Sequence, residues 1–246
     1  MINRKTLCIL IFFLSACCYA NDTFSELNRL GFVEKDIPKG NDWFEANHCN
    51  YSYVVEFNDT LIIRKESMGY NEQGKVFEAG DLIYRGVDRG EFSGGGLYLE
   101  SKSDTTTRMM SGNVQHLVPV QKSLYIFTGL DHLLLRYGKV SIIQDYENPS
   151  VPERVTLLPG EPDAICFESN PEWPNFAIAG GDYFALLLLR GGEELNIVAI
   201  NTFWGGLGPT SVVKYHDDYI LGIRSGIAVV EAVSPYDYKI RYFVPK

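Results

Sequence analysis

Acidic side chains beside turns are the first residues in this chain whose chemical type suggests catalysis. Two carboxyl groups about 5–10 Å apart can cleave a glycosidic bond, one as the acid and the other as the base or nucleophile. Such a hydrolase requires its acids to converge on one central pocket. Because the chain contains 31 acidic residues, solvated turn acids are the alternative interpretation. The candidates all flank predicted turns, and they are Asp145, Glu147, Glu161, Asp163, Asp182 and Asp218.

Other catalytic and metal-binding patterns are absent from the sequence. No two histidines stand two or four residues apart, and no Cys-x-x-Cys occurs. The sequence also lacks Gly-x-Ser-x-Gly, a P-loop, a dinucleotide fingerprint and an EF-hand loop. We therefore expect no metal site and no cofactor.

One glycine-rich loop and two aromatic loops are candidates for binding. The hydroxyl of Ser93 and the backbone N–H groups of the three glycines after it suit an oxyanion or a phosphate, although a plain hairpin loop uses glycines in the same way. Large apolar side chains on loops are typical interface anchors, and the alternative is that they fold back into the core. The candidate partner-binding residues are Phe92, Ser93, Trp173, Phe203, Trp204 and Leu207.

The N-terminal segment predicts export from the cytoplasm. Arg4 and Lys5 precede the apolar run Leu7–Leu14, and small residues follow it, as in a signal peptide. The run is too short to cross a bilayer, which needs about 20 apolar residues. Cleavage after Ala20 would remove residues 1–20 and leave residues 21–246 as a single mature domain.

A second processing site overlaps the first. Leu14-Ser15-Ala16-Cys17 resembles the lipobox of bacterial lipoproteins, in which cleavage precedes the cysteine and a lipid is attached to it. The resemblance implies that Cys17 carries the lipid and that the protein meets a membrane only through this anchor. Either site predicts a bacterial protein of the periplasm or the outer membrane.

Two cysteines, Cys49 and Cys166, remain if cleavage follows Ala20. Pairing is the expected state of two cysteines in an oxidising compartment. A Cys49–Cys166 disulfide would close a loop of over about 100 residues and contribute about 4–5 kcal/mol in the chain-entropy model. Two buried free thiols are the alternative. Cleavage before Cys17 would leave Cys18 as an additional, odd thiol.

The charge balance favours basic partners. The chain has 22 Lys and Arg against 31 Asp and Glu, and removal of Arg4 and Lys5 with the leader raises the excess of acids from 9 to 11. An acidic surface repels nucleic acid and anionic lipids and attracts basic proteins or cations. The expected partner is therefore a basic protein and not a nucleic acid, while solubility alone is the alternative explanation.

Short apolar runs between turn residues predict an all-β domain that follows a short helix over residues 22–31. Four units of the form strand, glycine-containing turn, strand begin at Leu82, Leu124, Phe176 and Tyr219. Their first residues are 42, 52 and 43 positions apart, close to the roughly 40–50 residues of a four-stranded propeller blade.

The last unit, which ends at Val230, looks like a β-propeller blade, and the resemblance is to the architecture rather than to one family. It implies a β-propeller-like fold of about five blades, in which strands before Leu82 supply the fifth blade and the C-terminal strand Tyr238–Val244 closes the ring. An irregular β-sandwich or barrel is the alternative.

These observations favour an exported protein-binding or inhibitor module over an enzyme. Its acidic surface would steer a basic partner, and Trp204 with its neighbours would anchor that partner. An exported, acidic propeller without catalytic motifs is similar in general type to periplasmic immunity proteins that neutralise antibacterial effectors. The alternatives are an envelope glycan hydrolase or lyase on a propeller scaffold, and a structural or assembly lipoprotein of the outer membrane.

Overall fold

A computed structural model describes residues 22–67, 75–92, 95–101, 105–132, 135–168, 175–189, 193–234 and 237–246. The predictions made for the leader, including both cleavage sites and the lipidation of Cys17, lie outside these residues. Within these ranges, no helix combines the length and the apolar character needed to cross a membrane.

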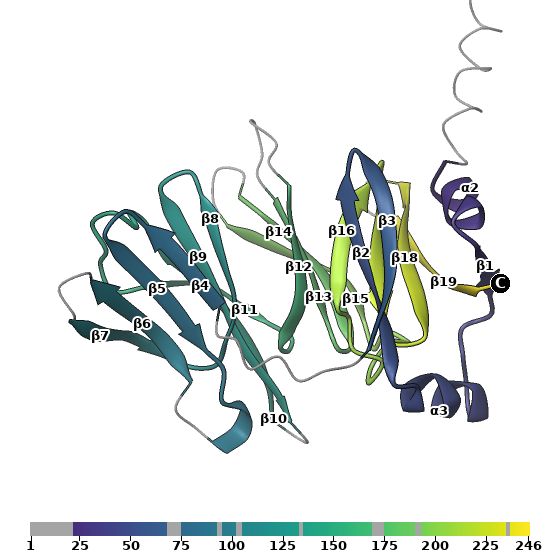
Figure 1. The fold of residues 1–246 in the computed structure, drawn as a ribbon, viewed down its shortest axis with the longest axis horizontal. Coiled ribbons are helices and arrows are strands. Elements are labelled where there is room, and N and C mark those ends of the chain that lie inside the picture. Colours follow the sequence, from purple (N-terminus) through teal and green to yellow (C-terminus); the bar gives the residue numbers. More distant parts are fainter. Residues whose placement is uncertain are drawn as a thin grey trace, which may run out of the picture.

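The described chain is dominated by β-strands, which form five antiparallel sheets (Figure 1). Its helices are α2 (Asp22–Arg29), α3 (Asn41–His48) and the short 3₁₀ helix η1 (Gly90–Phe92). The first sheet has two strands, β2 (Tyr51–Asn58) and β3 (Thr60–Ser67). The next three sheets have four strands each. They are β4 (Lys75–Ala79), β5 (Leu82–Val87), β6 (Gly96–Ser101) and β7 (Thr106–Ser111); then β8 (Val114–Val120), β9 (Ser123–His132), β10 (Leu135–Ile143) and β11 (Glu153–Leu158); and then β12 (Pro162–Glu168), β13 (Asn175–Gly180), β14 (Tyr183–Leu188) and β15 (Glu194–Ile200). The last sheet contains β16 (Ser211–Tyr215), β17 (Asp218–Ile223), β18 (Gly226–Ser234) and β19 (Asp237–Pro245), with β1 (Phe32–Lys35) at its edge.

The sheets stand side by side along an arc, and their first strands are neighbours. Strand β4 contacts β8, β8 contacts β12, β12 contacts β16, and β16 contacts β2. Sheets of a propeller follow one another in this way. In Figure 1 the β4–β7 sheet stands at the left, and the β16–β19 sheet stands at the right with the β2–β3 hairpin packed on it, so the ring is open. The prediction of an all-β, propeller-like fold with about five blades is therefore confirmed, with an open ring in place of a closed one.

Packing and charge explain where the arc ends. On one face of the β2–β3 sheet, Tyr53, Val55 and Leu61 are buried in a cluster with side chains of β17 and β18. The strand register places Arg64 and Glu56 on the opposite face, where they form an exposed ion pair. Because burying a charged face is costly, this face does not favour the docking of a further sheet.

The first and last described strands meet in one sheet. Strand β1 pairs with β19, and α2 packs beside them with Leu27 fully buried and Phe24 stacked on Phe243 at 5.7 Å between ring centroids. The predicted N-terminal helix is present, and Gly31 follows it with a φ of 90°. The C-terminal strand thus completes the last sheet but does not close the ring.

Antiparallel order places a fixed set of turns at one end of the strands, and we call this end of the strands the site end. Each strand reverses the direction of the one before it, so the β9–β10 turn, the β11–β12 connection and the β13–β14 turn all lie there. Apolar clusters between successive sheets hold these turns in place. Side chains from neighbouring sheets therefore meet at the site end.

His116 fastens β8 to β12 at this end. Its Nε2 lies 3.1 Å from the carbonyl oxygens of both Pro162 and Asp163, so the ring donates its N–H toward them. Burial, with a smaller contribution from Lys75, lowers the pKa of His116 to about 4, and the ring is neutral at pH 7. This contact fixes the beginning of β12, the strand that carries Asp163.

Replacing His116 by Gln should weaken the dependence of stability on acid pH. The unfolded ring takes up its proton near pH 6.5 and the folded ring only near pH 4, so acidification across this window favours unfolding. Gln retains a donor but has no such titration. Urea unfolding at about pH 7 and about pH 4.5 should show a larger loss of unfolding free energy in the natural protein than in His116→Gln. Equal losses would contradict a neutral His116.

Candidate active site

Four carboxyl groups converge at the site end, where the β8–β11 and β12–β15 sheets meet. Asp131 stands near the end of β9, Glu161 directly precedes β12, Asp163 is the second residue of β12, and Asp182 lies in the β13–β14 turn. The negative charges of the other three all act on Asp163. The side chains of Asp131 and Asp182 are each 27% exposed, so the cluster is reachable from solvent.

Arg136 joins two of these carboxylates across the two sheets. Its Nε lies 3.0 Å from Oδ1 of Asp131, and its Nη1 donates to Oδ2 of Asp182. Asp131 and Arg136 are cross-strand partners in β9 and β10, so their side chains point to the same face of the sheet. The guanidinium therefore holds both aspartates as ion-paired carboxylates.

Glycines allow the two sheets to approach closely at this point. A Cβ at Gly129 would lie 2.6 Å from the Cα of Glu161, which is too close for any side chain. A Cβ at Gly181 would lie 3.3 Å from Oδ2 of Asp131 and 3.8 Å from Oδ2 of Asp163. The two carboxyl groups thus reach the same point from different sheets, and a side chain at Gly181 would crowd them.

Burial and neighbouring charge keep one carboxyl group protonated. Burial is the largest cause, and Glu161, Asp131 and Asp182 add to it, so that the pKa of Asp163 is raised to about 8. Burial also raises the pKa of Glu161, although Oε2 of Glu161 accepts the N–H of Asp131 at 2.8 Å, which acts in the opposite direction. At pH 7, a protonated Asp163 therefore faces the ion-paired carboxylate of Asp131.

This pair supplies both partners of acid–base chemistry. A protonated carboxyl group can donate its proton to a leaving group, while a carboxylate can accept a proton from water or attack an electrophilic carbon. Two carboxyl groups whose environments separate their protonation states are the usual acid and base of such sites. The arrangement is thus suited to cleaving a bond whose leaving oxygen needs a proton.

Three of the six predicted acids, Glu161, Asp163 and Asp182, are brought together in this cluster. The other three lie elsewhere: Asp145 accepts the N–H of Glu147 at 3.0 Å within a turn, Glu147 is exposed, and Asp218 accepts the N–H of Ala232 at 3.1 Å. For these three, the alternative interpretation as turn or surface acids is the better one.

Sequence reasoning missed Asp131 and Arg136. A signal for Asp131 was present, because it stands two residues after Gly129, just as Asp182 stands two residues after Gly180. These glycines occupy equivalent places in their strand–turn–strand units. No comparable signal exists for Arg136, whose role depends on the pairing of β9 with β10.

The aromatic loop between β15 and β16 folds into the core, which corrects the prediction that it anchors a partner. Trp204 and Leu207 are buried, and the indole N–H of Trp204 donates to the carbonyl oxygen of Gly180 at 2.9 Å. Phe203 is half-buried, between the rings of Trp204 and Tyr242. Burial of these large apolar groups is the alternative that the sequence left open. Trp173, Ser93 and the side chain of Phe92 lie outside the described residues.

The predicted disulfide is also corrected, since Cys49 and Cys166 are both free. Cys49 lies just ahead of β2, and its thiol donates to the carbonyl oxygen of Tyr51, the first residue of that strand. Cys166 lies in β12 beside apolar core residues, and burial raises the pKa of its thiol. Strand β16 contacts β12, which carries Cys166, on one side and β2, which follows Cys49, on the other. The β16–β19 sheet therefore separates the two cysteines.

Among the described residues, no group of three or more His, Cys, Asp or Glu side chains is arranged to hold a metal ion.

No protein-family model and no curated protein matches this chain. Three distant solved structures are similar to it. A bifunctional GH43-CE protein of Bacteroides eggerthii has a TM-score of 0.35 and 12% identity, over 69% of this chain and 27% of that one. A GH43 protein of Bacillus licheniformis has a TM-score of 0.36 and 11% identity, over 85% of this chain and 43% of that one, and the Swd1 β-propeller domain of Myceliophteria thermophila has a TM-score of 0.38 and 10% identity, over 75% of this chain and 60% of that one. The chain spans less than half the length of the two GH43 proteins. At these scores the likeness carries no functional argument.

Truncating Trp204 should destabilise the fold. Trp204→Ala removes a fully buried indole and leaves the Gly180 carbonyl without its donor, so we expect a loss of about 3–5 kcal/mol in unfolding free energy. The control Phe44→Ala, at a residue that is 57% exposed, should change stability by less than about 1 kcal/mol. Urea unfolding measures both, and similar effects of the two substitutions would contradict the core role of Trp204.

Replacing Asp163 by Asn should stabilise the protein at neutral pH. The folded carboxyl group keeps its proton up to about pH 8 whereas the unfolded one loses it near pH 3.8, so stability falls as pH rises between these values. Asn has no proton to lose, and the melting temperature should rise by about 2–4 °C for each kcal/mol gained. Thermal unfolding at pH 7 checks this result, and a lower melting temperature for Asp163→Asn would contradict it.

Proposed function

We propose that this protein cleaves glycosidic bonds, with Asp163 as the general acid and Asp131 as the base or nucleophile. The observation that carries the proposal is the meeting of these two carboxyl groups beside Gly181, with Asp163 protonated and Asp131 ion-paired to Arg136. The sequence-based hypothesis of a glycan hydrolase required acids that converge at one central pocket. The convergence of four acids between the β8–β11 and β12–β15 sheets supports the first part of that requirement.

Each neighbour of the pair has a definite task in this proposal. Arg136 positions Asp131 through their ion pair, while its second bond holds Asp182 beside the same site. The negative charges of Glu161 and Asp182 help to keep the proton on Asp163. When the leaving oxygen takes that proton, the Asp163 carboxylate can later recover it from the water that completes hydrolysis.

The proposed setting is the bacterial cell envelope. The signal-peptide-like leader would deliver the protein there, as a free domain cleaved after Ala20 or as a lipoprotein anchored at Cys17. Glycans of the envelope are then the substrates within reach. The competing idea of a module that binds a basic partner through Trp204 and Leu207 is not supported, because both side chains are buried.

Substitution of either aspartate should strongly reduce cleavage without unfolding the protein. We expect Asp163→Asn and Asp131→Asn each to lower kcat by about 10²–10⁴-fold, because each removes one proton-transfer or nucleophilic group. The matched control Glu147→Gln, at an exposed acid outside the cluster, should retain full activity. The measurement is the release of new reducing ends from purified peptidoglycan and from a panel of nitrophenyl glycosides. Absence of any release by the natural protein, or full activity of Asp163→Asn, would contradict the proposal.

The pH profile gives a separate check. Because Asp163 must carry its proton to act as the acid, kcat/KM should fall as pH rises through about 8. An activity that keeps rising above this pH would exclude Asp163 as the acid, even if cleavage itself is observed.

A further inference from the structure

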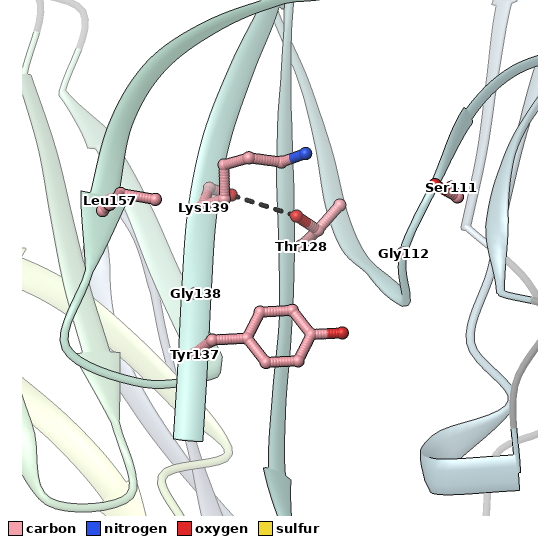
Figure 2. A pocket seen from close by; sticks show the side chains of 7 residues that line it. All are labelled: Ser111, Gly112, Thr128, Tyr137, Gly138, Lys139 and Leu157. Atoms are coloured by element: carbon pink, nitrogen blue, oxygen red, sulfur yellow. Dashed lines mark hydrogen bonds between the residues drawn. The ribbon is translucent and has the colours of Figure 1, made fainter. Parts of the chain in front are cut away.

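A hollow of about 330 Å³ lies beside the β8–β11 sheet, and Figure 2 shows the residues that line it. Its walls are the end of β7 at Ser111, Gly112 directly after it, and the facing parts of β9, β10 and β11. Ligand pockets commonly measure about 300–1,000 Å³, so the hollow is large enough for a small group.

Strand geometry separates this hollow from the proposed catalytic site. Arg136 points toward the β12–β15 sheet, where it binds Asp182, and successive side chains of a strand point to opposite faces. Tyr137 and Lys139 therefore point toward the β4–β7 sheet. His132 shares this face, and it pairs there at 2.6 Å with Glu91 of η1. The hollow thus belongs to a different junction between sheets.

Lys139 gives the hollow a positive charge. Figure 2 shows the side chains of Lys139 and Tyr137 reaching from β10 across β9 toward Gly112, with Thr128 between them. The Thr128 hydroxyl donates to the backbone carbonyl of Lys139 at 3.3 Å. The hollow is lined by no acidic residue, and Lys139 is in none of the ion pairs formed among the described residues. No described carboxylate therefore competes with an anionic group for its ammonium.

Exposed apolar side chains surround this charge. Tyr137 is 45% exposed and Leu157 is 60% exposed, and Leu157 is the cross-strand partner of Lys139. Leu135, two positions before Tyr137 on the same face, is 67% exposed. Large apolar groups gathered on one surface are a common mark of a binding site. The combination of apolar walls with one cation selects an amphipathic anion.

We propose that this hollow binds a carboxylate carried on an apolar group, with Lys139 pairing with the carboxylate and Tyr137 and Leu157 covering the apolar part. A small free acid and the C-terminus of a peptide with an apolar last residue both present this chemistry. The overall excess of acidic residues does not prevent such binding, because exposed charges more than about 8–10 Å away are largely screened at physiological ionic strength.

Matched pairs of probes test this site by NMR titration of the isotopically labelled protein. The acids are 3-phenylpropionate and the tripeptide Gly-Gly-Phe, and the controls are the uncharged amides of both. We expect the acids to shift the amide signals of residues 111–112, 128 and 137–139, and to bind at least about tenfold more tightly than their amides. Binding of only one of the two acids would identify which source of carboxylate the site accepts.

Variants of the protein complete the test. Lys139→Met should weaken binding of the acids by about tenfold and leave the amides unaffected, because it removes the charge alone. Lys122→Met, at an exposed lysine of the β8–β9 turn, should bind as the natural protein does. Equal binding of acids and amides, or no effect of Lys139→Met, would overturn the proposal. Asp163→Asn should bind the probes unchanged, so this test stands or fails independently of glycan cleavage.

Discussion

The close approach of the β8–β11 and β12–β15 sheets is the constraint on which the proposed site depends. Gly129 and Gly181 have no side chains to keep the sheets apart, and His116 ties β8 to the first residues of β12. The approach removes Asp163 from water and brings it beside Asp131. Desolvation favours the neutral form of a carboxyl group, so the backbone geometry itself determines which acid keeps its proton.

The same constraint links function to stability. A carboxyl group that is partly buried beside three other acids costs stability, and the fold has to compensate for that cost elsewhere. Arg136 offsets part of it by pairing with two of the acids, and the buried Trp204 secures the neighbouring sheet through the carbonyl of Gly180. The aromatic loop between β15 and β16, which the sequence suggested as a binding surface, therefore stabilises the sheet that carries Asp163 and Asp182.

The sequence predicts the class and repeat of the fold because these depend on local patterns. Apolar runs and glycine turns repeat about once per sheet, and they indicate the propeller-like order. The open ring depends instead on the two faces of the β2–β3 sheet. The face with Tyr53 packs against β17 and β18, and the face with Arg64 is charged and exposed. Glu161, Asp163 and Asp182 were candidates because they flank turns, but only the register between sheets separates them from Asp145. The exposure of Trp204 and the pairing of Cys49 could not be predicted either, since both depend on contacts distant in sequence.

Direct titration of the Asp163 side chain tests the central claim most directly. Carbon-detected NMR of the protein follows the chemical shift of each aspartate carboxyl carbon as a function of pH, and comparison with Asp163→Asn assigns the signal. The structure predicts that the Asp163 carboxyl group remains protonated at pH 7 and titrates near pH 8. A midpoint near the ordinary value of 3.8 would show that Asp163 is charged at neutral pH, and would contradict its role as the acid.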